Sequence, residues 1–370
     1  VVNAETGRRF GRSLDPDTNG YTSESFEEGT VGLDMTLSLF EGFSRINQVR
    51  FRKMNKERSE WELKEKQNEL AYQVTDAYYK LILERKSLDL ALEQSRLSER
   101  YLKQTEVFVE LGLKSASDLQ EVKARREGDI YRYQSRGNSS RIALLHLKQL
   151  MNIQPGDTLA ILDTITASQV PPYSVSTVET LYAQSIEILP SIRMIDLKQK
   201  AAHKEYAIAG GAFSPSVFAR FTVGSNYYNT AFSARQLRDN IGKYVGVGIS
   251  FPLLSGLQRL TNQRKLKLNM YRLKNEEELE KQQLYTDIEQ TLLSLHTGYS
   301  EHQQALSQLD AETLVLKESE RKWEEGLISV FQLMEARNRF IAAKAELVRV
   351  RLQIEMMMKL EKYYRQGTFL

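Results

Sequence analysis

Two segments of the chain alternate strictly between apolar and polar residues. In each, every second position is apolar: Val31, Leu33, Met35, Leu37 and Leu39 in the first, and Val245, Val247, Ile249, Phe251 and Leu253 in the second. The positions between them are mostly glycine, serine, threonine or aspartate. A period of two predicts β-strands, and about ten residues is the length of a tilted strand that crosses a membrane. Alternation alone is equally compatible with a soluble sheet that has one face on a core.

A partner strand is predicted before each of these segments. Residues 216–225 (SVFARFTVGS) alternate in the same way and lead through a polar loop to the second segment. The partner of the first segment is expected as a stub over residues 1–4. The loop after the stub contains two turn signals, Asp15-Pro16 and Asn19-Gly20. The chain is therefore expected to begin inside its first strand, as an N-terminally truncated form.

After each strand the pattern changes to that of a very long helix. Residues 45–111 contain no glycine or proline, and residues 258–325 contain only Gly298. Each stretch would span about 100 Å as a helix, too long for a single globular core. Apolar residues recur at sevens: Val74, Leu81, Leu88 and Leu102, then Ile288, Leu295, Leu309, Leu316 and Trp323. Three positions after Val74, Leu88, Ile288 and Leu295 come small residues: Ala77, Ala91, Thr291 and Gly298. Ala305, seven residues after Gly298, continues this spacing. This pattern predicts a seam between closely packed, side-by-side helices.

Each long helix is predicted to end at a glycine and to be followed by a returning helix. Gly112 and Gly326 suit the left-handed residue that closes a helix. Two capping-box spacings follow, Ser115-x-x-Asp118 and Ser329-x-x-Gln332. The returning helices are expected to reach about residues 151 and 364. Two shorter helices, 177–189 and 191–208, are predicted on either side of Pro190.

These elements form two copies of one unit. The segment from Val31 matches that from Val245, and the segment from Glu110 matches that from Glu324, both at an offset of 214 residues. The predicted domain organisation has five parts: 1–43, the first and incomplete β-hairpin; 44–151, the first long helical hairpin; 152–213, a connector with shorter helices; 214–257, the second β-hairpin; and 258–370, the second long helical hairpin.

Composition narrows the possible functions. The chain has no cysteine, so disulfides and thiol chemistry are excluded, and its net charge of +3 gives no indication of a nucleic-acid partner. No apolar run is long enough for a transmembrane helix. The four histidines are scattered, without the i, i+4 spacing of a helical metal site. We therefore expect no enzyme, no cofactor and no metal.

The strands indicate how copies of the chain assemble. About four strands cannot close a membrane barrel, and open edges would promote aggregation. Two copies would give eight strands, whose interior is filled by side chains, whereas three would give twelve and leave room for a path. We therefore predict a homotrimer. Its lipid-facing residues would be the apolar strand positions Val31, Leu33, Met35, Leu37, Val245, Val247, Ile249 and Phe251.

Several motifs in order resemble the TolC-type outer-membrane efflux proteins. They are L-[FL]-x-G-[FL]-x-R at 39–45 and 253–259, Gly-Leu-x-Ser at 112–115 and 326–329, and LPSIRMIDLKQKAAHKEYAIAGGAFSPSV at 189–217. The loop GRSLDPDTN resembles members from Bacteroidetes-like bacteria. The resemblance implies a mainly α protein with a membrane β-barrel: a trimeric 12-stranded barrel in the outer membrane of a Gram-negative bacterium, on a 12-helix tunnel through the periplasm.

The resemblance also implies a function and its residues. The protein would be the exit duct of a tripartite efflux or type I secretion system, working with a periplasmic adaptor (membrane fusion) protein and an inner-membrane pump. The family's adaptor-docking tips match Gly112, Leu113, Ser115, Gly326, Leu327 and Ser329. The acidic pore gate past the tips matches Asp118, Glu121, Gln332 and Glu335. Asp118 and Gln332 are also capping-box residues, whereas Glu121 and Glu335 are not. Glu335 is the leading candidate.

Two questions stay open at the level of sequence. A soluble coiled-coil scaffold or a periplasmic adaptor without a channel would explain the helices but not the strands. Basic clusters also follow the strands: Arg45, Arg50, Arg52 and Lys53, then Arg259, Arg264, Lys265 and Lys267. These are either solvated helix faces or groups that meet acidic lipids at the inner rim of the membrane.

Overall fold

The computed structural model describes residues 1–14, 19–23, 25–154, 156–162, 170, 176–229, 234–252 and 257–369. It divides into two compact units. The strand unit comprises Val1–Arg58 and Asp196–Glu276, and the helical unit comprises Ser59–Ile195 and Glu277–Leu370. The predicted turn at Asp15-Pro16, residues 155, 163–169 and 171–175 of the predicted connector, and the repeat positions Leu253 and Gly256 lie outside the described residues.

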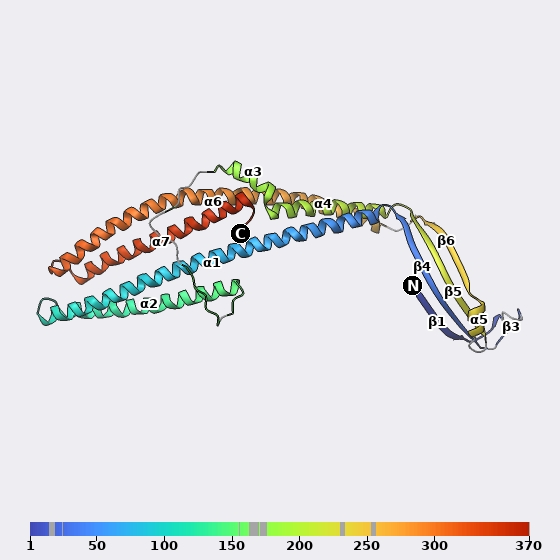
Figure 1. Ribbon diagram of the computed structural model, residues 1–370, viewed down its shortest axis with the longest axis horizontal. Helices are drawn as coiled ribbons and strands as arrows, with labels where there is room; N and C mark the ends of the chain where they lie inside the picture. Colours follow the sequence, from blue (N-terminus) through green and yellow to red (C-terminus); the bar gives the residue numbers. More distant parts are fainter. Residues whose placement is uncertain are drawn as a thin grey trace. The chain divides into compact units, whose positions relative to one another are not determined.

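The strand unit contains a four-stranded antiparallel sheet (Figure 1). Its strands lie in the order β1 (Val2–Arg9), β4 (Phe26–Glu41), β5 (Ser216–Asn229) and β6 (Gly242–Ser250). A separate two-stranded hairpin pairs β2 (Ser13–Leu14) with β3 (Tyr21–Thr22), and the short helix α5 (Ala234–Asp239) precedes β6. Within the described residues, β1 and β6 are the two unpaired edges of the larger sheet.

The register of this sheet brings the predicted apolar positions onto one face. Met35 pairs with Phe221 and Phe221 with Val245, so three apolar side chains form a row across three strands. Met35 is 57% exposed and Val245 is 76% exposed. On the opposite face Thr222 donates a hydrogen bond to Asp34 at 2.8 Å. The sheet therefore has one exposed apolar face and one polar face.

Several strands differ in length from the prediction. β1 spans eight residues rather than a stub, and β4 begins at Phe26, before the alternating run. Thr6 and Arg8 break the apolar alternation, but their backbones pair with Gly29 and Glu27 of β4. The prediction of a stub was wrong because backbone pairing, rather than apolar alternation, extends this strand. β6 ends at Ser250, so Phe251 follows the strand instead of lying in it.

Two long helical hairpins dominate the helical unit. The helix α1 (Ser44–Glu110) is followed by α2 (Ala116–Leu150), and α6 (Gln258–Glu324) by α7 (Val330–Gln366). Figure 1 shows α2 returning along α1 and α7 along α6. Both α1 and α6 contain 67 residues, which confirms the predicted duplication. No described helix has a stretch apolar enough to cross a membrane.

The predicted seam residues pack these hairpins. Ala77 and Leu81 are buried in the first copy, and Ile288 and Leu295 in the second. A Cβ added at Gly298 would lie 3.0 Å from a side-chain carbon of Ile354 on α7, which confirms that a small residue permits close approach here.

The predicted shorter helices are also observed, as α3 (Val178–Ile188) and α4 (Pro190–Gly211). Leu181 and Leu189 join the core formed by α6 and α7. The Ser185 hydroxyl of α3 donates to the carbonyl of Tyr364 on α7 at 2.8 Å. These contacts hold α3 against the end of the second hairpin.

Candidate gate at the helix tips

The two hairpins turn with the same backbone geometry. Gly112 has φ +75° and Gly326 has φ +74°, the left-handed conformation that favours glycine. In each turn the next residue closes the helix: the amide of Leu113 donates to the carbonyl of Phe108 at 2.8 Å, and that of Leu327 to Lys322 at 2.8 Å. The side chains of Leu113 and Leu327 are 66% and 68% exposed. Each tip thus presents an exposed leucine directly after its glycine.

A capping box starts each returning helix, as predicted. The Ser115 hydroxyl accepts from the amide of Asp118, whose carboxylate accepts from the amide of Ser115 at 3.0 Å. These hydrogen bonds lower the pKa of Asp118 below its usual value. Ser329 and Gln332 form the same box in the second copy, with 3.0 Å between the Ser329 amide and the Gln332 side-chain oxygen. Asp118 and Gln332 are therefore engaged in helix capping.

The other two gate candidates lie around one hollow between α2 and α7. The hollow has a volume of about 270 Å³ and is lined by Glu121, Arg125, Val330, Phe331, Met334, Glu335 and Asn338. Glu335 also forms a salt bridge with Arg339 at 3.1 Å. Two carboxylates, Glu121 and Glu335, thus line this small space together with the cation Arg125. The structure therefore separates the four predicted residues into two capping residues and one acidic pair.

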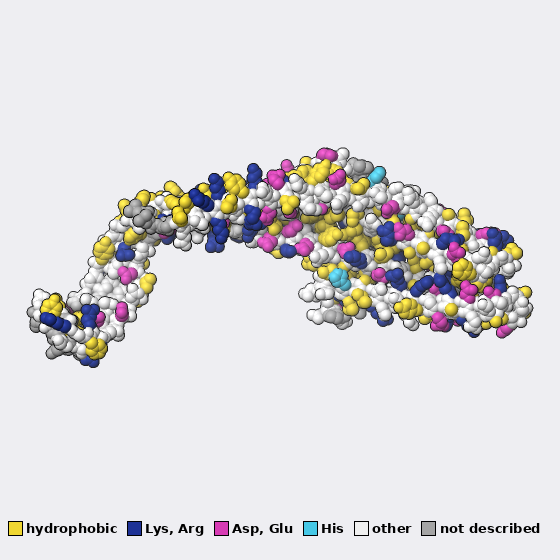
Figure 2. Space-filling view, turned by 180° about the vertical axis from the view of Figure 1, so that it is seen from behind, with side chains coloured by type: hydrophobic (Ala, Val, Ile, Leu, Met, Phe, Trp, Pro, Cys, Tyr) yellow, Lys and Arg dark blue, Asp and Glu magenta, His cyan; other side chains and the backbone are white. Residues whose placement is uncertain are grey.

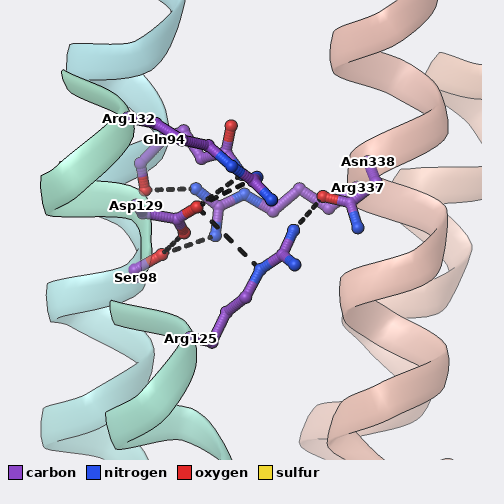
Figure 3. A network of polar contacts seen from close by, with 7 residues as sticks. All are labelled: Gln94, Ser98, Arg125, Asp129, Arg132, Arg337 and Asn338. Atoms are coloured by element: carbon purple, nitrogen blue, oxygen red, sulfur yellow. Dashed lines mark hydrogen bonds and ion pairs between the residues drawn. The ribbon is translucent and has the colours of Figure 1, made fainter. Parts of the chain in front are cut away.

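A buried polar network close to this hollow ties α7 to the first hairpin (Figure 3). Arg337 of α7 is 2% exposed and donates to the carbonyl of Gln94 and, at 3.3 Å, to the Ser98 hydroxyl of α1. Asp129 of α2 is 1% exposed and accepts from Gln94 at 2.9 Å and from Ser98. Ser98 therefore contacts both charged groups.

Further arginines complete the network. Arg132 lies 3.4 Å and Arg125 3.9 Å from the Asp129 carboxylate, and Arg125 also donates to Asn338 of α7. Burial lowers the pKa of Arg337 from its usual value, and the charge of Asp129 opposes this shift. The network joins side chains of three helices, α1, α2 and α7, because Ser98 and Gln94 of α1 contact both Asp129 and Arg337. Such a buried polar network constrains how the three helices pack.

An aromatic cluster lies next to the network. The Trp323 ring of α6 packs edge-on against Tyr101 of α1 at 5.3 Å between centroids. The Tyr101 hydroxyl donates to Glu320 at 2.9 Å, and Arg337 lies 5.6 Å from the Tyr101 ring centre. The aromatic cluster and the polar network thus both join the first hairpin to the second, and they lie next to each other.

Sequence reasoning missed this network, although a signal was present. Arg337 follows the buried Val330 by seven residues, and Asp129 follows the buried Val122 by seven. A charged residue at a heptad core position needs a buried partner, because leaving it unpaired is costly. Both charged side chains could therefore have been flagged as a matched pair.

Comparisons with known proteins agree with this architecture. The family model described as outer membrane efflux protein matches residues 4–152 and 181–356. A search of curated proteins finds no match.

Solved structures of outer-membrane channels share the fold. The CmeC outer membrane channel of Campylobacter jejuni is 12% identical, with a TM-score of 0.80 over 99% of this chain and 78% of that one. The outer membrane protein VceC of Vibrio cholerae is 15% identical, with a TM-score of 0.80 over 100% and 88%. The MtrE outer membrane channel of Neisseria gonorrhoeae, in its open state, is 16% identical, with a TM-score of 0.76 over 100% and 80%.

Proposed function

Since the chain belongs to the outer membrane efflux protein family, we propose that it is the outer-membrane exit duct of a tripartite efflux or type I secretion system. It receives substrates from an inner-membrane pump through a periplasmic adaptor and passes them to the exterior. The observation that carries this proposal is the order of elements within each repeat: strands with an exposed apolar face run directly into a helical hairpin. A soluble coiled-coil scaffold would not explain strands with an exposed apolar face.

We further propose that three copies close the barrel. The open edges β1 and β6 provide unpaired backbone groups, which cannot remain unsatisfied in lipid. Pairing β6 of one copy with β1 of the next satisfies both edges, and three copies give twelve strands. The apolar face with Val31, Leu33, Met35, Leu37, Val245, Val247 and Ile249 then faces lipid, with Phe251 just past the end of β6.

We assign adaptor docking to the two helix tips and the gate to the hollow between α2 and α7. The turns with Gly112, Leu113 and Ser115, and with Gly326, Leu327 and Ser329, present exposed leucines to the adaptor. Glu335 and Glu121 form the cation-sensitive gate, since three copies of an acidic pair around one axis concentrate negative charge. Asp118 and Gln332 act mainly as capping residues.

Disulfide trapping tests the closed barrel. Because the chain has no cysteine, Ala4→Cys in β1 can be combined in turn with one cysteine at each of positions 243 to 249 of β6. A non-reducing gel of detergent-extracted outer membranes is expected to show covalent trimers for the matching register. Single Ala4→Cys is the control and forms no trimer. Recovery of the chain as a soluble monomer without detergent would overturn the duct.

A further inference from the structure

The helices of the strand unit begin with a dense concentration of positive charge. Residues 44–58 and 258–276 each contain six lysines or arginines and one glutamate, whereas the whole chain has a net charge of only +3. Figure 2 shows lysine and arginine side chains gathered on this helical part. We call eight of these cations the basic band: Arg45, Arg50, Lys53 and Arg58 of α1, and Arg259, Arg264, Lys267 and Arg272 of α6.

The basic band is repeated within the chain. Each of the four α1 cations in the basic band has a cation of the same type in α6, at the offset of 214 residues that relates the two copies. Between residues 44–58 and their counterparts 258–272, the only other identity is Asn55 with Asn269. The four cations of the band are therefore kept in both copies, whereas Arg52 and Lys56 stand opposite Leu266 and Met270, and Lys265 stands opposite Phe51. This pattern indicates a common requirement for positive charge in both copies.

Contacts within the chain do not account for the centre of the band. Arg50, Lys53, Arg264 and Lys267 are exposed, and none of them forms an ion pair with a described residue; only the outer members Arg45 and Arg272 do, with Glu41 and Glu276. Neither α1 nor α6 has an acidic residue in its first turn. Cations in the first turn of a helix oppose the helix dipole, so the outer members Arg45 and Arg259 do not gain stability from it.

The band follows an exposed apolar collar at the strand ends. Phe43, Ile46 and Val49 are exposed at the start of α1, and Leu257 and Leu260 at the start of α6. Arg50 and Lys53 lie about 9 and 14 Å along the helix from Ser44. Helical side chains tilt toward the N-terminus, here back toward the strand. Long cationic side chains can therefore lie over the collar with their charged ends at headgroup level.

We propose that the basic band binds the phosphate headgroups of anionic phospholipids in the membrane leaflet next to the strand ends. The inference rests on the proposed barrel, which places these helix starts at the membrane surface. Lysine and arginine near an anionic surface are attracted to its phosphates, and the attraction is screened by salt. The band would fix the depth of the barrel in the membrane.

A lipid-binding measurement on the full chain in neutral detergent tests the proposal. The variant R50Q/K53Q/R264Q/K267Q removes the unpaired cations of both copies. Fluorescent phosphatidylglycerol and phosphatidylcholine are titrated against each protein and followed by anisotropy. The unmodified chain is expected to prefer phosphatidylglycerol by about tenfold near 0.15 M salt and to lose the preference at 1 M salt. The variant is expected to show no preference.

Two further variants serve as controls. R96Q/K123Q/R141Q/K317Q removes the same residue types from exposed positions elsewhere on the helices and should keep the preference, as should the charge-preserving R50K/R264K. An undiminished preference in R50Q/K53Q/R264Q/K267Q would overturn the proposal. Dissociation of that variant into monomers would also overturn it, since the band would then be a contact between copies.

Conductance in planar bilayers separates this proposal from the proposed function. If the unmodified chain conducts but its preference for phosphatidylglycerol does not depend on the basic band, the lipid inference alone fails. If the unmodified chain forms no channel, the proposed duct fails, and the lipid inference fails with it.

Discussion

Single residues decide how the two hairpins are joined near the tips. Arg337 and Asp129 are both buried and share Gln94 and Ser98 as partners. Asp129→Ala should lower the stability of the helical unit by about 3 kcal/mol, because removing one member of a buried charged network leaves the others unpaired. The midpoint of thermal unfolding by circular dichroism measures this loss.

Glu127→Ala is the matched control, because Glu127 is exposed and forms an ion pair with Arg126 of its own helix. It should change stability by less than about 0.5 kcal/mol. Equal unfolding midpoints for the two variants would show that the network contributes little to joining the hairpins.

Glu335 is the residue on which the proposed gate depends most. Glu335→Gln keeps the size of the side chain and removes its charge, so block of single-channel current by divalent cations should weaken roughly tenfold, with a smaller effect for Glu121→Gln. Glu324→Gln, a similar change at an exposed carboxylate outside the hollow, at the end of α6, should leave block unchanged. Unaltered block in the Glu335 variant would exclude it from the gate.

At the scale of elements, the two capping boxes form a natural pair for a pH experiment. The lowered pKa of Asp118 means that its stabilising contribution is present above the unfolded value, near 3.8, and is lost as pH falls through the lower folded value. The Gln332 box carries no charge to titrate. Acid should therefore loosen the α1–α2 tip and spare the α6–α7 tip.

Hydrogen exchange of the tip amides, corrected for its intrinsic pH dependence, measures the difference. Asp118→Asn should abolish the pH dependence of the first tip. Equal acid loosening of both tips would contradict the assignment to Asp118.

At the scale of the whole molecule, the exposed tip leucines are expected to act together. Leu113→Asp with Leu327→Asp should reduce efflux in cells and adaptor binding by at least about tenfold, because charge replaces the apolar contact at each tip. Conductance of the purified channel should be unchanged. Leu314→Asp alters another exposed leucine, on α6, and should leave efflux intact; normal efflux in the tip variant would remove the tips from adaptor docking.

Sequence by itself determined the duplication, the two long hairpins and both tip turns. These features are local, since periodicity, a left-handed glycine and a capping box act within a few residues. The ends of α1 at Glu110 and of α6 at Glu324, two residues before the predicted glycines, confirm that such local signals locate helix ends.

Tertiary structure alone decided the rest. β1 extends to Arg9 because β4 pairs with it. Glu121 and Glu335 line one hollow because α2 and α7, which are far apart in sequence, both contribute to it. Arg337 finds Gln94 and Ser98 more than 230 residues away. Contacts between residues far apart in sequence depend on which surfaces pack together in the folded chain. A periodic pattern indicates only that one face of a helix or strand is buried. It does not indicate which residues cover that face.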